Sequence, residues 1–391
     1  MLILYVALKY DYGRPEQGYS FEHHNFYHSL LHMRHDILYF DFMTLLQEHG
    51  REWMNRRLLE VAKAERPDLM FTVLFTDELY PAVIREISEN TDTVTLNWFS
   101  DDHWRFENYS RYWAPCFNWV ITTAKSALRK YARLGHRNVI KSQWACNQFL
   151  YRKLHLPLEY DVTFVGKPHG NRREIIQALR DAGINVQVWG SGWESGRLSQ
   201  EEMIRIFNQS RINLNLSNAS TPVSTPKARA RNLTRKWFSR SLDVVPFGSK
   251  AKAMSKTWLS ALRPSASVAL DQGRRVNLGQ QYTEQIKARN FEIPGCGGFL
   301  MTGTAENLED YYDIGRAVVC FDDVDALIRK VRYYLNHEDE RATIAEAGYM
   351  RTLQEHTYVR RFNEIFQQIG IPRKAFNVEQ SVYRGQTEEV H

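Results

Sequence analysis

Short apolar runs alternate with amphipathic stretches along this chain, and the alternation occurs twice. In the first half we expect strands at residues 2–8, 36–40, 69–74, 93–97 and 119–122. Helical patterns lie between them, at residues 22–35, 42–63 and 125–135. Strands that alternate with helices through short loops are typical of a parallel sheet covered by helices. The first half therefore predicts an α/β domain.

The same rhythm restarts after a linker-like stretch at residues 155–160. Here we expect strands at residues 162–166, 186–189 and 212–216, with helices at 172–181 and 203–210. The expected fold class is α/β, with two Rossmann-like parallel-sheet domains that face a central cleft. We place the first domain at residues 1–155, the second at 156–372, and a polar tail at 373–391.

Residues 219–281 break this rhythm and carry many more basic than acidic side chains. We interpret them as an insertion in the second domain that contacts something anionic or caps the cleft. A solvated basic surface loop is an equal alternative.

Composition narrows the class of protein. A chain of 391 residues is long enough for two domains, and its net charge of +6 permits an anionic partner. Four scattered cysteines without metal-ligand spacing predict reduced thiols in a cytoplasmic protein. Because no run of about 18 apolar residues occurs, we expect no transmembrane segment, although peripheral membrane contact stays open.

Two carboxylates, Glu284 and Glu292, stand eight residues apart with Lys287 and Arg289 between them. Carboxylates hydrogen-bond sugar hydroxyls, and cations suit phosphate groups. The pattern predicts a site for a molecule that is part sugar and part diphosphate, which is a nucleotide sugar.

Two glycine turns follow expected strands of the second domain. Gly166 and Lys167 lead to a helix that carries Arg173, and backbone N–H groups with two cations suit a diphosphate. Gly190 allows close backbone approach, and the Trp193 ring suits stacking on a base. The alternatives are a plain strand–helix turn and a turn with buried tryptophans.

Asp101, Asp102 and His103 follow the strand expected at residues 93–97, where side chains reach the cleft of an α/β domain. One of them could accept the proton of an acceptor hydroxyl. An ordinary helix cap beside an exposed histidine is the alternative.

We expect no metal site. Asp323 and Asp325 precede a helical pattern and suit a helix cap. Four histidines at helical spacing lack a carboxylate or cysteine partner in register: His23, His24, His28 and His32.

The stretches DVTFVGKPHGNRREII, VWGSGW, INLNLS and KARNFEIPGCGGFLMT follow one another in this order. Together they resemble the CgeB-type (spore maturation protein family) members of the group 1 glycosyltransferases, which have the GT-B fold. The resemblance covers residues 160–370 strongly and the first half more loosely.

This resemblance implies a glycosyltransferase that takes a nucleotide-diphosphate sugar as donor substrate, needs no cofactor or metal, and retains anomeric configuration. It implies that Glu292 holds the donor ribose, that Glu284 lies by the transferred sugar, and that Lys167 and Arg173 hold the diphosphate. The first domain is then the acceptor side, and the acceptor stays open among glycan, protein, lipid and nucleic acid. Two alternatives stay open as well: a non-catalytic protein of this fold that binds an anionic polymer or surface through the basic insertion, and a sugar-nucleotide epimerase.

Overall fold

The computed structural model describes residues 1–222 and 282–370 of the chain. Met1–Asn218 and the described residues from Glu284 onward form one compact unit, and Ala219–Thr283 belong to a second. Nearly all of the expected basic insertion and the whole of the expected polar tail lie outside the described residues. The site described below lies within the first unit.

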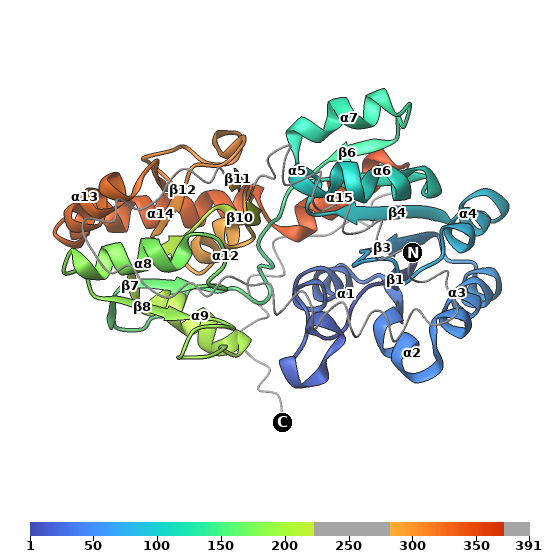
Figure 1. Cartoon of the computed structure of the whole chain (residues 1–391), viewed down its shortest axis with the longest axis horizontal. Coiled ribbons are helices and arrows are strands. Elements are labelled where there is room, and N and C mark those ends of the chain that lie inside the picture. Colours follow the sequence, from blue (N-terminus) through green and yellow to red (C-terminus); the bar gives the residue numbers. More distant parts are fainter. Residues whose placement is uncertain (223–281, 371–391) are drawn as a thin grey trace, which may run out of the picture. The chain divides into compact units, whose positions relative to one another are not determined.

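The first half of the chain forms a six-stranded sheet in which all paired strands are parallel (Figure 1). Its spatial order is β2-β1-β3-β4-β5-β6. The strands are β1 (Leu2–Val6), β2 (Asp36–Phe40), β3 (Leu69–Thr72), β4 (Val94–Phe99), β5 (Trp119–Thr122) and β6 (Val139–Lys141).

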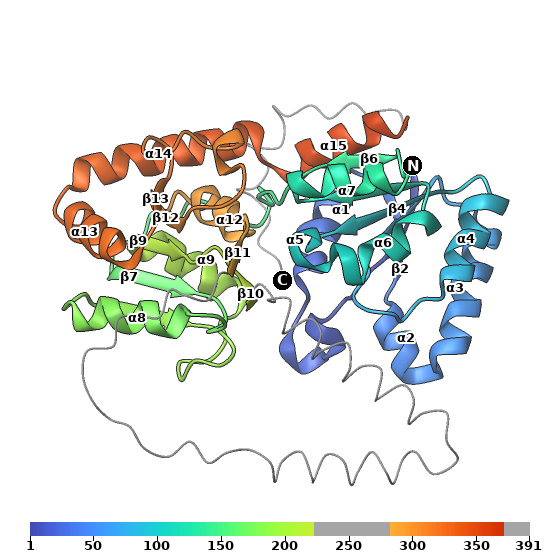
Figure 2. The ribbon, with the colours of Figure 1, turned by 45° about the horizontal axis from the view of Figure 1, so that its top comes forward.

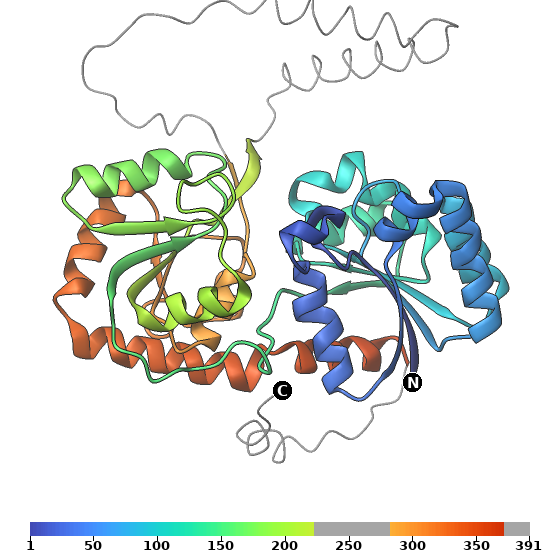
Figure 3. The same cartoon turned by 90° about the horizontal axis from the view of Figure 1, so that it is seen from below.

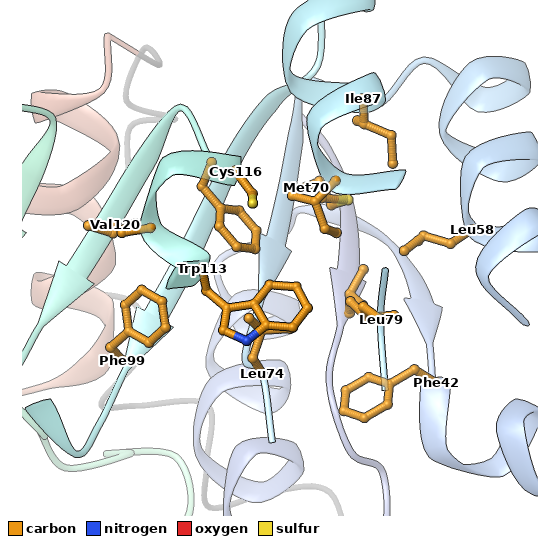
Figure 4. Packing of buried hydrophobic residues seen from close by; sticks show 14 of the residues in the cluster. Phe42, Leu58, Met70, Leu74, Leu79, Ile87, Phe99, Trp113, Cys116 and Val120 are labelled. Atoms are coloured by element: carbon orange, nitrogen blue, oxygen red, sulfur yellow. The ribbon is translucent and has the colours of Figure 1, made fainter. Parts of the chain in front are cut away.

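Helices bury both faces of this sheet. Within β1, Leu4 and Val6 join one apolar cluster, whereas Ile3 and Tyr5 join another, as the two-residue period of a strand requires. The first cluster includes Phe42, Leu58 and Ile87 from the helices beside the sheet (Figure 4). The helices of this half are α1 (His28–His32), α2 (Phe42–His49), α3 (Arg51–Glu65), α4 (Pro81–Asn90), α5 (Asp102–Arg105), α6 (Ser110–Trp113) and α7 (Leu128–Arg133), with a π-helical turn η3 (His23–Tyr27) before α1.

The second half forms a five-stranded parallel sheet in the order β13-β12-β9-β7-β8. Its strands are β7 (Tyr160–Val165), β8 (Val186–Trp189), β9 (Ser210–Asn215), β12 (Leu300–Gly303) and β13 (Val319–Phe321). Two further strands, β10 (Asn218–Pro222) and β11 (Tyr282–Glu284), pair with each other.

Helices cover this sheet on two faces as well (Figure 2). One apolar cluster joins the sheet to α8 (Arg172–Asp181) and α13 (Val324–Leu335). The other joins it to α9 (Gln200–Gln209) and α12 (Arg289–Gly295). The long helix α14 (Glu338–Glu355) follows α13 and leads to α15 (Tyr358–Gln368).

Helix α15 packs in the core of the first sheet, although the sequence grouped its residues with the second domain. Tyr358, Phe362 and Ile365 share an apolar cluster with Ile3 and Phe71. Figure 3 shows α15, the red end of the ribbon, beside α1. The start of α15 is stabilised after the turn from α14, because the Thr357 side chain caps the helix by accepting a hydrogen bond from the Arg360 backbone N–H. The core of the first sheet thus includes residues from both ends of the described chain.

Two features of the secondary structure differ from the expectation. The single helix expected at residues 42–63 is two helices, because Gly50 adopts a positive φ of 84° and its N–H closes α2 on the Leu46 carbonyl. Strands β6, β12 and β13 were not predicted, since runs of three or four residues are too short to show a clear strand pattern. No helix in the described part of the chain is long and apolar enough to cross a membrane.

Candidate functional site

A pocket of about 340 Å³ lies at the carboxyl ends of β3 and β4. These strands pair in parallel, with Thr72 opposite Asn97, so the loops that follow them start at the same sheet edge. The Asn97 amide oxygen accepts a hydrogen bond from the Leu74 N–H at 3.2 Å and so holds the loop after β3 against β4. Residues 73–75, 98–101 and 285–288, except Ile286, form part of the lining.

Three adjacent residues predicted for the acceptor side have different environments. Asp101 lines the pocket, and its side chain makes no capping hydrogen bond to α5. Asp102 is 0% exposed and accepts a hydrogen bond from the Tyr131 hydroxyl at 2.8 Å. Burial raises the pKa of Asp102, and hydrogen bonds from Ser110, Thr122 and Tyr131 oppose the rise. Asp102 therefore ties the loop to α7 and is not accessible to a substrate in this structure.

His103 is half-buried beside the same loop. Burial lowers its pKa to about 4, and the positive charge of Lys287 lowers it further. The imidazole is therefore neutral at pH 7 and retains a ring nitrogen that can accept a proton.

Lys287 links the pocket to the carboxylate predicted for the donor. It lines the pocket, and its half-buried ammonium interacts with Asp101 and Glu284. Burial lowers its pKa to about 8, the neighbouring Arg172 lowers it as well, and the two carboxylates oppose the change. Its backbone is fixed, since the Lys287 N–H donates to the Asn290 side-chain oxygen at 2.9 Å.

A buried polar network explains that fixed backbone. The Asn215 amide group, at the end of β9, donates to the Asn290 oxygen at 2.9 Å and to the Thr302 hydroxyl at 3.0 Å. All three side chains are almost fully buried. Because buried polar groups are costly without partners, the network fixes β9, β12 and α12 against one another and thereby places Lys287.

Glu284 is the last residue of β11 and is exposed as a whole residue. The surrounding protein nevertheless desolvates part of its carboxyl group. The Ser217 hydroxyl donates to it. Desolvation raises the pKa of Glu284, whereas the Ser217 hydrogen bond and the charges of Lys287 and Arg172 lower it. A carboxylate between two cations is thus available beside the pocket.

Arg172 is a cation whose charge acts on Glu284, whereas Arg173, which was predicted to hold the diphosphate, contacts the second glycine turn. Arg172 is 6% exposed and donates to the Leu216 carbonyl at 2.6 Å and to the Lys167 carbonyl at 3.0 Å. Arg173 is exposed, donates to the Gly192 carbonyl and stacks on Trp193 at 4.7 Å. The apolar spacing of α8 contained the signal: Arg172 lies three and four residues before the buried Ile175 and Ile176, on the face that packs on the sheet.

The two glycine turns meet each other. The Trp193 indole N–H donates to the Gly166 carbonyl at 2.8 Å, and the Gly166 N–H donates to the Trp189 carbonyl at 2.8 Å. Gly190 has a φ of 138°, and a Cβ there would lie 2.5 Å from the Gly166 carbonyl oxygen. Trp193 and Arg173 line a second pocket of about 530 Å³ beside β8, whereas Lys287 lines the pocket at the ends of β3 and β4.

Lys167 points to the other half of the chain. Its ammonium donates to the Tyr12 hydroxyl at 2.7 Å and lies 4.1 Å from the centre of the Tyr12 ring. Tyr12 belongs to the loop after β1. A diphosphate contact by Lys167 would therefore compete with this pair.

Glu292 forms an ion pair with Arg289 that is buried on the Glu292 side. Glu292 is 0% exposed, its Oε1 accepts a hydrogen bond from the Tyr151 hydroxyl at 2.7 Å, and its Oε2 pairs with Arg289. Both carboxylate oxygens are therefore occupied in this structure. A ribose could reach Oε2 only if Arg289 moved away.

The structure also brings in a carboxylate that the sequence did not single out. Glu22 precedes η3 and lines the pocket together with Asp101. Burial raises its pKa to about 7, and the negative charges of Asp11 and Asp101 contribute. No local motif marks this residue, because its partner in the pocket lies on another strand loop.

The histidines of η3 and α1 pack among aromatic rings. His23 stacks on Tyr19 at 4.2 Å and on Tyr27 at 5.0 Å, and burial lowers its pKa to about 3. Across the described residues, no group of three or more His, Cys, Asp or Glu side chains is arranged to hold a metal ion.

Two helix-covered parallel sheets and a polar pocket at strand ends place the chain in the α/β class with two sheet domains, and comparison with known proteins identifies the family. Residues 172–239 and 229–367 match the family described as "Glycosyl transferase-like", and together they span half of the chain. The chain belongs to this family, which confirms that it is a glycosyltransferase.

Individual relatives agree with this family. The chain is 20% identical to spore protein CgeB of Bacillus subtilis (strain 168) over 298 residues, which are 76% of this chain and 81% of CgeB. It is similar to Anabaena Alr3699/HepE in complex with UDP-glucose, with 12% identity, 94% of this chain and 99% of that chain covered, and a TM-score of 0.59. A glycosyltransferase from Rickettsia africae ESF-5 gives 10% identity, coverage of 95% and 99%, and a TM-score of 0.54. These likenesses confirm the expected GT-B fold and the resemblance to CgeB-type proteins.

Proposed function

We propose that this chain transfers a sugar from a nucleotide-diphosphate sugar to an acceptor, with retention of configuration and without a metal ion. The position of Lys287 carries the proposal. Lys287 lines the pocket together with Asp101, and the charges of Glu284, Asp101 and Arg172 all act on its ammonium. This arrangement places cations for a diphosphate and a carboxylate for sugar hydroxyls next to a pocket that can hold the acceptor.

In this proposal the cations replace a metal ion. Lys287 and Arg172 stabilise the negative charge that develops on the diphosphate as its bond to the sugar breaks. Glu284 accepts hydrogen bonds from hydroxyls of the transferred sugar. The spacing of Glu284 and Glu292, which resembles that of retaining enzymes of this group, supports retention.

The transfer step then needs no base from the protein. The acceptor oxygen bonds to the anomeric carbon on the face that the diphosphate leaves, and the bond from that carbon to the phosphate oxygen breaks. The acceptor proton passes to the departing phosphate oxygen. Asp101 and His103 remain available to orient the acceptor.

Two residues predicted to bind the donor, Glu292 and Lys167, can do so only after a side-chain contact in this structure is broken. Arg289 has to release Glu292 before that carboxylate can hold a ribose, and Lys167 has to leave Tyr12 before it can hold a phosphate. Uridine is the first base to test, since the similar structure of HepE contains UDP-glucose, or UDP in a second complex.

A thermal-shift screen against UDP-, GDP-, ADP- and TDP-sugars tests the donor. A donor at about 100 times its Kd stabilises the folded chain by about 2.7 kcal/mol. The variant Lys287→Met should lose this shift, whereas Lys63→Met should keep it, because Lys63 forms an exposed ion pair with Glu86 on the helices of the first sheet. Absence of a shift with every nucleotide sugar would refute the proposal.

The products separate the remaining alternatives. Transfer that persists in EDTA supports metal independence, and the anomeric proton signals of the product report retention or inversion. Conversion of the donor into an isomer without transfer would identify an epimerase. The polymer-binding alternative depends on residues 219–281, nearly all outside the described residues, and predicts binding that falls steeply with salt.

A further inference from the structure

The pocket at the ends of β3 and β4 carries a pair of carboxylates that the donor does not require. Glu22 precedes η3, and Asp101 follows β4. Both line the pocket, and they are close enough for the charge of Asp101 to act on Glu22. A short π-helical segment such as η3 is frequently found at functional sites.

Aromatic rings form much of the remaining wall. The Phe21 and Trp144 rings lie 5.0 Å apart edge to face, and Trp144 lies 6.0 Å from Trp98. All three residues line the pocket. Such rings offer flat apolar surfaces of the kind that the C–H face of a sugar ring can cover.

The cations in the lining are already engaged. Arg105 donates to the Phe75 carbonyl at 3.0 Å and stacks on the Tyr109 ring at 3.9 Å. Lys287 faces Asp101 and Glu284. The lining has two carboxylates and two cations, so it offers no surplus of positive charge to a phosphate or nucleic-acid acceptor. Burying the carboxylates under a lipid chain would also be unfavourable.

We propose that the acceptor is a saccharide and that Glu22 and Asp101 bind its hydroxyl groups in this pocket. The proposal rests on the proposed glycosyl transfer and names the substrate class of its acceptor side. Carboxylate oxygens accept hydrogen bonds from sugar hydroxyls, while the rings of Phe21 and Trp144 support the sugar face. A volume of about 340 Å³ is at the lower end of the range for small-molecule pockets, which suits a short saccharide end group.

The test compares Glu22→Gln with wild type. Glutamine keeps the volume of the side chain and removes the carboxylate. UDP release from UDP-glucose is measured at about pH 7.5, where Glu22 is mostly ionised and Lys287 mostly protonated, with glucose, N-acetylglucosamine, maltose, glycerol, octanol or a short oligonucleotide as acceptor probe. Thermal shift by UDP is measured on the same samples.

We expect a saccharide probe to stimulate UDP release by wild type and the KM for that saccharide to rise at least tenfold in Glu22→Gln. The UDP thermal shift should be unchanged. Glu16→Gln is the matched control, since Glu16 is exposed in the same loop region, and it should behave as wild type.

The outcomes distinguish this inference from the proposed function. A UDP shift with no stimulation by any saccharide, or with stimulation only by octanol or the oligonucleotide, overturns the saccharide proposal and leaves the donor proposal standing. An unchanged saccharide KM in Glu22→Gln overturns the role of Glu22. Absence of the UDP shift in wild type would instead count against the proposed donor.

Discussion

The contact among Tyr151, Glu292 and Arg289 gives a sharp prediction, because it decides whether Glu292 is an internal tie or a ribose ligand. Replacing Tyr151 by phenylalanine removes the hydroxyl that donates to Glu292 at 2.7 Å. The acceptor is charged and 0% exposed, so the lost hydrogen bond should cost about 2 kcal/mol. This cost would lower Tm by roughly 4–8 °C in a domain of 150–250 residues, and because the compact unit that holds Tyr151 is larger, we expect a fall of about 4 °C or less.

Replacing Glu292 by glutamine should cost more than the tyrosine change. Removal of one partner of a buried ion pair costs about 3–5 kcal/mol. The Arg289 side chain is 26% exposed, so water offsets part of that cost, and we expect a loss of about 2–4 kcal/mol. Differential scanning calorimetry of the free protein measures both changes.

The chain provides a matched control for the tyrosine change. Tyr333 donates to Glu340 at 2.8 Å, almost the same distance, but both groups are exposed. Tyr333→Phe should therefore shift Tm by less than about 2 °C, since such surface contacts contribute little. If Glu292→Gln kept the wild-type Tm and lost only the thermal shift by UDP, Glu292 would be a ligand and the internal-tie reasoning would be refuted.

Three further changes have expected outcomes. Arg172→Met should destabilise the chain by about 1–3 kcal/mol in denaturant titrations, because the Lys167 and Leu216 carbonyls lose their partner, and it should abolish the UDP shift. Arg173→Met should change the stability by no more than about 0.5 kcal/mol. Equal losses of stability in the two variants would contradict the conclusion that Arg172 is the buried, structurally important arginine. Gly190→Ala should lower Tm more than Gly183→Ala, since both have positive φ but only Gly190 meets a carbonyl oxygen, and equal Tm values would show that the contact is not restrictive. Stability should fall as pH drops from about 6.5 to 4, because burial lowers the pKa of several histidines in the fold and the unfolded chain takes up more protons in that window. Glu22, Asp102 and Glu284 have raised pKa values and act in the opposite sense, but the histidines outnumber them, so a Tm that rises on acidification would refute the histidine argument. The histidines with a pKa of about 3 or 4 are His23, His24, His103, His169 and His356.

The sequence predicted the fold well because its signal is local. Apolar runs such as residues 36–40, 119–122 and 186–189 coincide with the observed strands, since a buried parallel strand needs a continuous apolar segment. The break at Gly50 was missed because the apolar pattern continues across it. Only the backbone angle of that one residue separates the two helices.

The site was predicted less completely because side-chain direction depends on tertiary packing. Asp101 and Asp102 are neighbours in the sequence, but Asp102 is turned inward by its hydrogen bond to Tyr131 on a separate helix. Glu22 could not be singled out, since its pairing with Asp101 joins segments about 80 residues apart in the printed sequence. Arg172 could have been found, because helical periodicity places it on the buried face of α8.

The packing of α15 in the first core has a consequence for how the chain is made. Strand β6 ends at Lys141, and α15 ends at Gln368, so 368 − 141 = 227 residues are translated between them. At about 5–20 residues per second this takes roughly 11–45 s. During that time the first sheet has been synthesised but the helix that supplies Tyr358 and Phe362 has not, and part of one apolar face of the sheet stays exposed. A ribosome that stalls in this interval would therefore hold a chain suited to chaperone binding, however complete its first six strands are.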